Sequence, residues 1–311
     1  MTTATSVAVT GANGFVGRRL VAELAARGYA VRALVRHATV PLVGASDIRS
    51  IGDLTASDGL LAGAVEGVDV VVHAAGIAHT KGVPEERMHE VNVGGTTLVV
   101  GACKKVGVRR LVFISSVRAQ SGPSARQVLT EATPPVPVDA YGRSKLAAER
   151  SLAEVDLDWV ALRPVLVYGP AVTGNLRALL KLARSPLPLP FGAVSGLRSL
   201  LAVDALAAAV ATVIETPAPL RRAFLVADAR PLTLPQMLVA LRQGLGRPPR
   251  LVGVPEPLLR GLLHSFGRSA VAERLLGSLV VDTAALEALG WQPATSTEAG
   301  LAALAAGGTS E

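Results

Sequence analysis

The chain has 311 residues, of which 50% are apolar and 18% are charged, and its formal net charge is +7. This length fits one large α/β domain, or one domain with a smaller second part, and the apolar content allows a sizeable core. The arginines are scattered without a long basic run, so the charge favours an enzyme that binds small anions over a nucleic-acid-binding protein.

The first residues, the apolar segments and the cysteine content exclude further classes. Met1–Ser6 is polar and leads directly into a strand, so we expect no signal peptide and a cytoplasmic protein. The apolar window closest to the roughly 18 residues of a membrane span is Leu200–Ile214, which contains Asp204 and predicts a buried helix. Cys103 is the single cysteine, which excludes an intrachain disulfide, and we expect it to be buried in a helix. The histidines lack the spacing of metal ligands, so we expect no metal site. Because no apolar window reaches the length of a membrane span, we also expect no membrane partner.

The first predicted elements are a strand, a glycine-rich turn and a helix. The strand covers Ser6–Thr10, glycines follow at Gly11, Gly14 and Gly17, and an amphipathic helix covers Val16–Ala26. Glycines let the backbone approach a diphosphate, and the helix N-terminus offers free N–H groups and the positive end of its dipole. The G-x-x-G-x-x-G spacing departs from the usual G-x-G-x-x-G, and a tight turn without a ligand is the alternative. The pattern favours a dinucleotide.

The second predicted strand bears on the type of dinucleotide. An acid commonly follows this strand in proteins that bind NAD, where it takes the ribose hydroxyls. This chain carries Arg36 and His37 there instead. Arg36, helped by Arg32, is suited to a 2′-phosphate, and an arginine that faces water is the alternative. The sequence therefore favours NADP over NAD.

Strands and helices alternate through the first half of the chain. We expect further strands at Ala30–Val35, Ile48–Ile51, Val68–His73, Arg110–Ser115 and Trp159–Arg163, and helices at Ser57–Ala64, Glu85–Lys105 and Tyr141–Glu154. Near-continuous apolar strands are typical of a parallel sheet that is covered on both faces. The alternation predicts an α/β protein with a doubly wound parallel sheet, the Rossmann fold.

The rhythm changes after Pro164, where prolines cluster and the predicted helices become short. We expect residues 1–165 to form a dinucleotide-binding domain. We expect residues 166–311 to form mostly a smaller C-terminal part that supplies the substrate pocket, with some segments returning to the sheet. Leu258–Leu263 and Ala270–Leu276 are apolar helical segments, which we expect core or subunit packing to cover.

Tyr141 and Lys145 form the second informative pattern, because residues four apart share one face of a helix. A nearby ammonium lowers the pKa of a phenol from about 10 toward neutrality, which suits proton exchange with an alcohol or a ketone. Ser116 follows a predicted strand, and its hydroxyl can hydrogen-bond the same substrate oxygen. An ordinary surface pair is the alternative, but the order of glycine turn, serine, tyrosine and lysine favours catalysis.

Together these motifs resemble the extended branch of the short-chain dehydrogenase/reductases over nearly the whole chain. The resemblance rests on the glycine turn, Asp53-Leu54, His73–Gly76, Asn92, Ser116, Tyr141-x-x-x-Lys145 and Arg163–Pro170. It implies that Ser116, Tyr141 and Lys145 carry catalysis, that Lys145 also bonds the nicotinamide ribose, and that Asp53 meets the adenine. The cofactor-binding residues that it implies are Gly11, Asn13, Gly14, Phe15, Val16, Gly17, Arg36, Asp53, Leu54, His73, Ala74, Ala75, Gly76, Asn92, Tyr141, Lys145 and Pro164.

Within that branch the chain is similar to the UDP-glucose 4-epimerase-like group and to nucleotide-sugar 4-ketoreductases. The resemblance implies hydride transfer at C4 of a nucleoside-diphosphate sugar, with Ser116, Asn175 and Arg198 in the substrate site. It also implies a homodimer through the helices at 85–105 and 141–154. Val117–Ser121 and Leu166 depart from the pattern of relatives and leave the identity of the sugar open.

Three alternatives stay open at this point. An epimerase recycles its hydride and can keep one NAD, whereas a reductase exchanges NADPH in each turnover, and Arg36 tilts the choice toward reduction. A reductase of a small non-nucleotide carbonyl compound would lack diphosphate-binding groups such as Asn175 and Arg198. A non-catalytic NADP-binding regulator typically lacks the tyrosine and the lysine.

Overall fold

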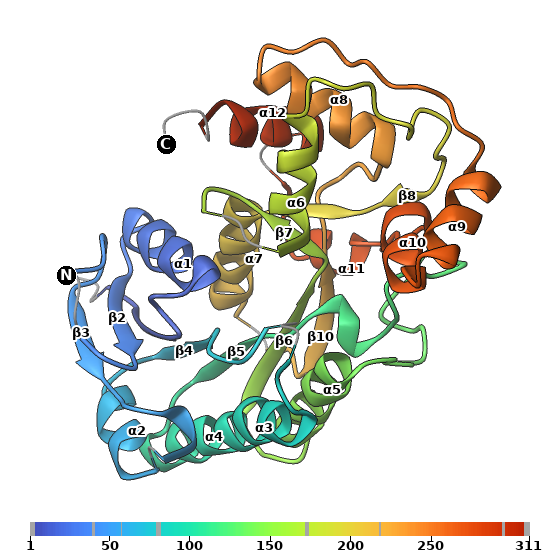
Figure 1. The fold of residues 1–311 in the computed structure, drawn as a ribbon. Coiled ribbons are helices and arrows are strands. Elements are labelled where there is room, and N and C mark those ends of the chain that lie inside the picture. Colours follow the sequence, from blue (N-terminus) through green and yellow to red (C-terminus); the bar gives the residue numbers. More distant parts are fainter. Residues whose placement is uncertain are drawn as a thin grey trace.

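A parallel seven-stranded sheet forms the centre of the molecule (Figure 1). The computed structural model describes residues 4–38, 41–56, 58–78, 82–171, 174–217, 219–293 and 296–307, without the side chains of Asp58 and Asn175. The strand order is β10-β6-β5-β4-β1-β2-β3, and every neighbouring pair is parallel. The strands are β1 (Ser6–Thr10), β2 (Ala30–Val35), β3 (Asp47–Ser50), β4 (Val70–His73), β5 (Arg110–Ile114), β6 (Asp158–Pro164) and β10 (Arg222–Val226). This order confirms the doubly wound parallel sheet.

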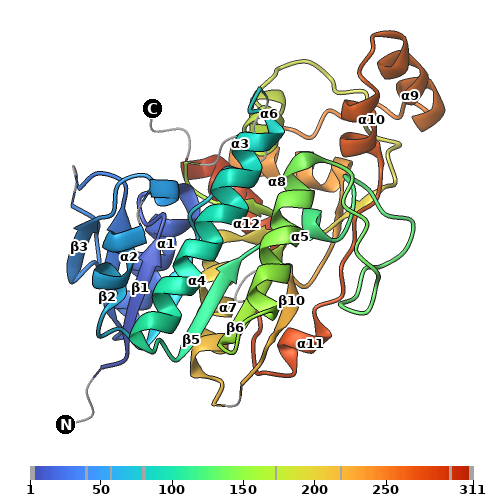
Figure 2. The same ribbon diagram turned by 90° about the horizontal axis from the view of Figure 1, so that it is seen from below.

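Helices cover both faces of the sheet, and each face has its own apolar core. On one face lie α1 (Phe15–Ala26) and α7 (Val203–Glu215), whose residues Leu20, Leu24, Leu206 and Val210 are buried in one cluster. On the other face lie α2 (Asp58–Val65), α4 (Gly95–Val106) and α5 (Ala140–Ala153), with α3 (Glu85–His89) before α4 (Figure 2). Buried apolar strands between two helical layers are the expected result of near-continuous apolar runs.

The expected bounds of the first elements agree closely with the structure. β1 and β2 have the predicted bounds, β4 begins at Val70, and Cys103 is buried in α4, where burial raises the pKa of its thiol to about 12. Two expectations were wrong in detail. The predicted helix over residues 85–105 is interrupted by a π-helical turn at Glu90–Gly94. Residues 200–202 of the predicted buried helix form a strand, β9, and α7 begins only at Val203.

The C-terminal half follows the carboxyl ends of β6 and β10 and has a third apolar core (Figure 1). Its short sheets pair β7 (Leu166–Tyr168) with β9 (Leu200–Ala202), and β8 (Leu197–Arg198) with β11 (Leu232–Thr233). Its helices are α6 (Gly174–Ala183), α8 (Leu234–Gly244), α9 (Glu256–Ser265), α10 (Ser269–Leu276), α11 (Ala284–Glu287) and α12 (Thr297–Gly307). Short 3-10 turns lie at Leu54–Ala56 and Val117–Ala119. Among the described residues, no helix has the length and apolar character that crossing a membrane requires.

Candidate active site

The turn between β1 and α1 has no room for side chains at two of its glycines. Gly11 has φ +65°, and a Cβ there would lie 2.8 Å from the backbone of Ala75. A Cβ on Gly17 would lie 2.1 Å from the Gly11 carbonyl oxygen, which also accepts a 2.9 Å hydrogen bond from the Gly14 amide. Asn13 lies in this turn, and Phe15 and Val16 begin α1, whose first amides have no acceptor within the helix. The backbone is therefore exposed to a close anionic ligand at a helix N-terminus.

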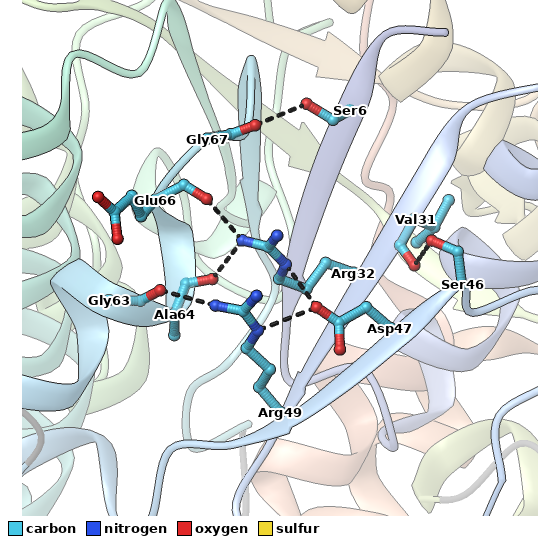
Figure 3. A network of polar contacts seen from close by, with 10 residues as sticks. All are labelled: Ser6, Val31, Arg32, Ser46, Asp47, Arg49, Gly63, Ala64, Glu66 and Gly67. Carbon is cyan, nitrogen blue, oxygen red and sulfur yellow. Dashed lines mark hydrogen bonds and ion pairs between the residues drawn. The ribbon is translucent and has the colours of Figure 1, made fainter.

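The arginines near β2 have different surroundings. The Arg32 guanidinium donates to Asp47 at 2.9 Å and to the carbonyls of Ala64 and Glu66 at 3.0 and 2.8 Å (Figure 3). These bonds tie β2 to β3 and α2, so the expectation that Arg32 helps to bind a phosphate was wrong. Arg36 follows the carboxyl end of β2 and is exposed.

Asp53 and Leu54 lie beyond the end of β3. The Asp53 carboxylate accepts hydrogen bonds from the amide and the hydroxyl of Thr55, at 3.0 and 2.8 Å, and pairs with Arg87 at 3.1 Å. The Thr55 bonds hold the pKa of this carboxyl below its usual value; burial opposes them, and the Arg87 charge adds a smaller lowering. Leu54 is buried against Gly95, where a Cβ would lie 2.6 Å from its side chain.

His73 locks the carboxyl ends of β1 and β4 together. Its Nδ1 is 2.7 Å from the Thr10 hydroxyl, which also accepts from the Ala75 amide at 3.2 Å, and its Nε2 is 3.1 Å from the Thr96 hydroxyl. Burial, and then the charge of Lys145, lower the pKa of His73 to about 3. A neutral imidazole therefore fixes the backbone of His73–Gly76 beside the glycine turn.

Asn92 joins the segment after β4 to α5. Its carbonyl oxygen accepts from the Ile77 amide at 2.7 Å, and its amide donates to the Ile77 carbonyl at 3.1 Å and to the Ser144 hydroxyl at 2.9 Å. A Cβ on Gly76 would lie 2.8 Å from the same Asn92 oxygen. The polar atoms of Asn92 thus position neighbouring backbone.

Ser116, Tyr141 and Lys145 come together where β5 ends and α5 begins. The Asp139 carboxylate caps α5 by accepting from the Gly142 amide at 2.8 Å, which fixes the helix turn that carries Tyr141. The Ser116 hydroxyl hydrogen-bonds the Tyr141 phenol. The Lys145 ammonium donates to the Ile114 carbonyl at 2.9 Å and lies 4.5 Å from the centroid of the Phe113 ring. The structure thus brings the three predicted catalytic side chains to one edge of the sheet.

The pKa of the Tyr141 phenol is raised above 10, opposite to the expected lowering. Burial is the largest cause and outweighs the Ser116 hydrogen bond, while Asp139 raises and Arg118 lowers the value. The pKa of Lys145 is lowered to about 8 by burial, against the opposing charge of Glu149. The Lys145 ammonium is directed to the Ile114 carbonyl, and burial disfavours the charged form of the Tyr141 phenol. The lowering of the Tyr141 pKa that the spacing predicts was therefore wrong.

Sequence reasoning missed a buried network directly behind these residues. Glu149 accepts from the Ser115 hydroxyl and from the Arg163 guanidinium, whose Nε lies 3.0 Å from one of its oxygens. Arg163 also donates to Gln120 at 3.2 Å. Glu149 lies four residues after Lys145, so helix spacing could have indicated a shared face. The network ties β5, α5 and β6 together one turn from the catalytic side chains.

The predicted substrate residues lie in the C-terminal half. Arg198 donates to the carbonyls of Pro123 and Glu273, both at 3.0 Å, while its Nε is buried without a partner among the described residues. Burial, and then the charge of Arg118, lower its pKa to about 10. Asn175 lies in the first turn of α6, and its side chain is outside the described residues. Pro164 is buried at the end of β6, and Leu166, directly beyond it, is 42% exposed.

Comparisons with known proteins agree with this arrangement. A family model described as the NAD dependent epimerase/dehydratase family matches residues 7–227. The chain is 32% identical to the UDP-glucose 4-epimerase of Vibrio cholerae over 95% of this chain and 93% of that protein. It is 29% identical to the ceramide reductase of Caulobacter vibrioides over 81% and 74% of the two chains. The crystal structure of Thermus thermophilus UDP-glucose 4-epimerase with NAD superposes with a TM-score of 0.73 at 26% identity, covering 96% and 97% of the two chains.

Proposed function

The chain belongs to the NAD dependent epimerase/dehydratase family, and from this premise we propose that it transfers hydride at C4 of a nucleoside-diphosphate sugar. One observation carries the proposal. Tyr141 and Lys145 lie on one helix beside Ser116, at the sheet edge that also holds the glycine turn. Proton exchange at a hydroxyl next to a bound dinucleotide is the chemistry that this juxtaposition supports.

The residues at the sheet edge fit a dinucleotide. The backbone of Gly11–Gly17 would hold the diphosphate, because a Cβ at Gly11 or Gly17 would occupy space that the backbone already needs. Asp53 would meet the adenine, and Arg36 would meet a 2′-phosphate. A bound nicotinamide accepts or supplies the hydride. NAD(P) binding follows from the family, and the preference for NADP is our proposal, supported by Arg36 alone.

The chain's own residues handle the proton at the C4 oxygen. When the sugar is oxidised, the Tyr141 phenolate takes the hydroxyl proton as the C4–H bond breaks and its electron pair leaves as hydride. In reduction, the phenol returns that proton to the oxygen. The Ser116 hydroxyl donates to the same oxygen and holds it in place. The Lys145 ammonium, which donates to the Ile114 carbonyl, lies on the same helix as Tyr141 and would bond the nicotinamide ribose.

Arg198 supports a diphosphate-bearing substrate. Its Nε has no partner among the described residues, and a guanidinium matches a phosphate in a bidentate manner. We assign Asn175 to the same substrate group from its place in the first turn of α6.

A second candidate, the reduction of an apolar carbonyl compound, is favoured by Leu166. This side chain is 42% exposed immediately beyond the carboxyl end of β6. Relatives with this reaction type include the ceramide reductase. In that case the ketone arrives as substrate, NADPH is exchanged in each turnover, and Arg198 has no diphosphate to bind.

Two measurements test the proposal. Mass spectrometry of the gently purified protein identifies a retained dinucleotide: tightly held NAD supports epimerisation, and an NADP-loaded or empty site supports reduction. Thermal unfolding with UDP then tests the substrate, because a ligand that binds the native state raises Tm. We expect UDP to raise Tm in the native chain and not in Arg198→Met. An unchanged Tm with UDP, together with reduction of apolar ketones, would favour the second candidate. The homodimer that the resemblance implies stays a prediction.

A further inference from the structure

Helix α9 lies at the outer side of the C-terminal half (Figures 1 and 2). Exposed apolar side chains form a ridge along it. Leu258, Leu262 and Phe266 are 69%, 57% and 72% exposed, and their spacing of four residues places them in one stripe. Leu259, the next residue along the helix, is buried in the third core. Core packing therefore covers Leu259 but not Leu258 or Leu262, and the subunit packing that is the other expectation for this segment stays a prediction.

A shallow groove continues the ridge. It is lined by Val254, Pro257, Leu258, Leu259, Leu262 and Ser265, of which all but the last are apolar. Five of the large apolar side chains with high exposure lie within residues 252–271, and they include Val252 and Val271. The apolar surface is therefore a continuous feature of the α9–α10 hairpin rather than a set of isolated residues.

The segment that carries the ridge is basic. Residues 247–274 contain five arginines and two glutamates, Glu256 and Glu273, and Arg260 pairs with both, at 2.9 and 2.7 Å. Arg268, two residues beyond Phe266, is exposed and forms no ion pair with any residue that the structure describes. Arg250 is also exposed, and within the part of the chain that the structure describes its side chain donates to the carbonyl of Pro186, at 3.3 Å. The acidic groups are thus neutralised locally, and the surplus charge is positive.

The hairpin is joined to the residues assigned to the substrate. The Glu273 carbonyl of α10 accepts from Arg198, and the Glu273 carboxylate accepts from the Ser124 hydroxyl at 2.9 Å. A Cβ on Gly277, at the end of α10, would lie 2.7 Å from the Cβ of Ser124. A partner bound to the ridge would therefore lie near Arg198, which we assign to the substrate site.

We propose that Leu258, Leu262 and Phe266, with Arg268 beside them, dock the protein on the surface of an anionic lipid bilayer. A short helix with leucine and phenylalanine on one side and arginine around them is the pattern of interfacial membrane binding. Anionic headgroups complement the surplus positive charge. A second copy of the chain is a poorer occupant, because a twofold contact through this surface would oppose its arginines to themselves.

The test is sedimentation of the full-length protein with vesicles, either of pure phosphatidylcholine or with one third phosphatidylglycerol, at low ionic strength. We expect at least tenfold more binding to the anionic vesicles. The double variant Leu258→Gln/Leu262→Gln should lose that binding at least tenfold, and Arg268→Glu should weaken it several-fold and reduce its salt dependence. Leu60→Gln is the matched control, because Leu60 is 60% exposed on α2, in the other half, and should bind as the native chain does.

Other outcomes overturn the proposal. Failure of the native chain to bind anionic vesicles does so directly, as does equal loss of binding in Leu60→Gln. A native dimer in solution that the double variant converts to a monomer, without vesicle binding, would assign the ridge to a subunit interface. The double variant must keep the native Tm and dinucleotide affinity, and if it does not, Phe266→Ser replaces it, since that side chain is 72% exposed beyond the end of α9. These readouts do not depend on which substrate the enzyme uses.

Discussion

The two halves of the molecule bury their polar side chains in different ways. At the carboxyl edge of the large sheet, side chains bond one another: Thr10 with His73, Asn92 with Ser144, and Glu149 with Arg163. In the C-terminal half, buried arginines bond backbone carbonyls of loops instead. Arg242 is 1% exposed and donates to the carbonyls of Pro249, Ser185 and Leu187, at 2.6, 3.0 and 2.9 Å.

The two kinds of hydrogen bond suit different roles in the two halves. Side-chain pairs across strands fix the relative positions of β1, β4, β5, β6 and α5, which catalysis requires within fractions of an ångström. Arginines on loop carbonyls fix only the path of the chain, and they leave the surface residues free to vary with substrate and partner. The named pairs at the sheet edge therefore position the residues that we assign to catalysis, whereas Arg242 positions loops of the C-terminal half.

Tyr141 and Tyr168 give the largest expected contrast. Tyr141→Phe should lower turnover by about 10³-fold while leaving dinucleotide affinity and Tm unchanged, because only the proton carrier is lost. Tyr168 donates to Asp228 at 2.8 Å in the C-terminal half. Tyr168→Phe should therefore cost about 1–2 kcal/mol of stability with near-native turnover. Steady-state kinetics and urea unfolding on both variants measure this, and native turnover in Tyr141→Phe would remove that residue from the mechanism.

The next prediction concerns the buried network of Glu149 and Arg163 behind the catalytic side chains. Glu149→Gln should cost roughly 3 kcal/mol of stability, because Arg163 is left buried without its counter-charge. The Glu149 charge raises the pKa of Lys145, which is about 8. If the ammonium is needed for turnover, kcat/KM should decline as Lys145 loses its proton, and removal of the Glu149 charge should move that decline to lower pH.

Glu154→Gln, exposed at the end of the same helix, is the control and should change neither stability nor the pH profile. A profile that stays in place while stability falls would give Glu149 a purely structural role.

The sequence predicted features that have a local pattern and missed features that depend on residues far apart in the chain. β1, β2 and the glycine turn carry their signal in local patterns of apolar residues and glycines, and their bounds were predicted correctly. Glu149 bonds Ser115 and Arg163, 34 and 14 residues away, which no local pattern shows. The apolar segment at Leu258–Leu263 was assigned to packing because helical spacing shows that leucines share a face, not whether protein covers that face. Burial likewise reversed the sign of the pKa shift predicted for Tyr141.

Histidines from the two halves should differ in their response to acid. The pKa of His73 is about 3 in the folded protein and about 6.5 in the unfolded chain, so below pH 6.5 the unfolded state binds more protons. Stability should then fall by about 1.4 kcal/mol for each unit of pH between 6.5 and 3 on account of this residue. Urea unfolding from pH 7.5 to 5 measures the slope, which His73→Asn should reduce. His264→Gln, exposed on α9, should leave it unchanged, and an identical slope in all three proteins would contradict the assignment.

The smallest expected change in stability comes from two glycine substitutions, which test whether the two halves unfold together. Gly101 in α4 and Gly261 in α9 are exposed helical glycines at which a Cβ would meet nothing within 4 Å. Replacing either by alanine should add about 0.5–1 kcal/mol by removing conformational freedom from the unfolded chain. Because α7 and β10 of the C-terminal half share a core with α1 and β1, we expect one unfolding transition that both variants raise equally. Calorimetry decides the matter: two transitions, with each variant raising only one, would show that the halves are separate cooperative units joined at this sheet.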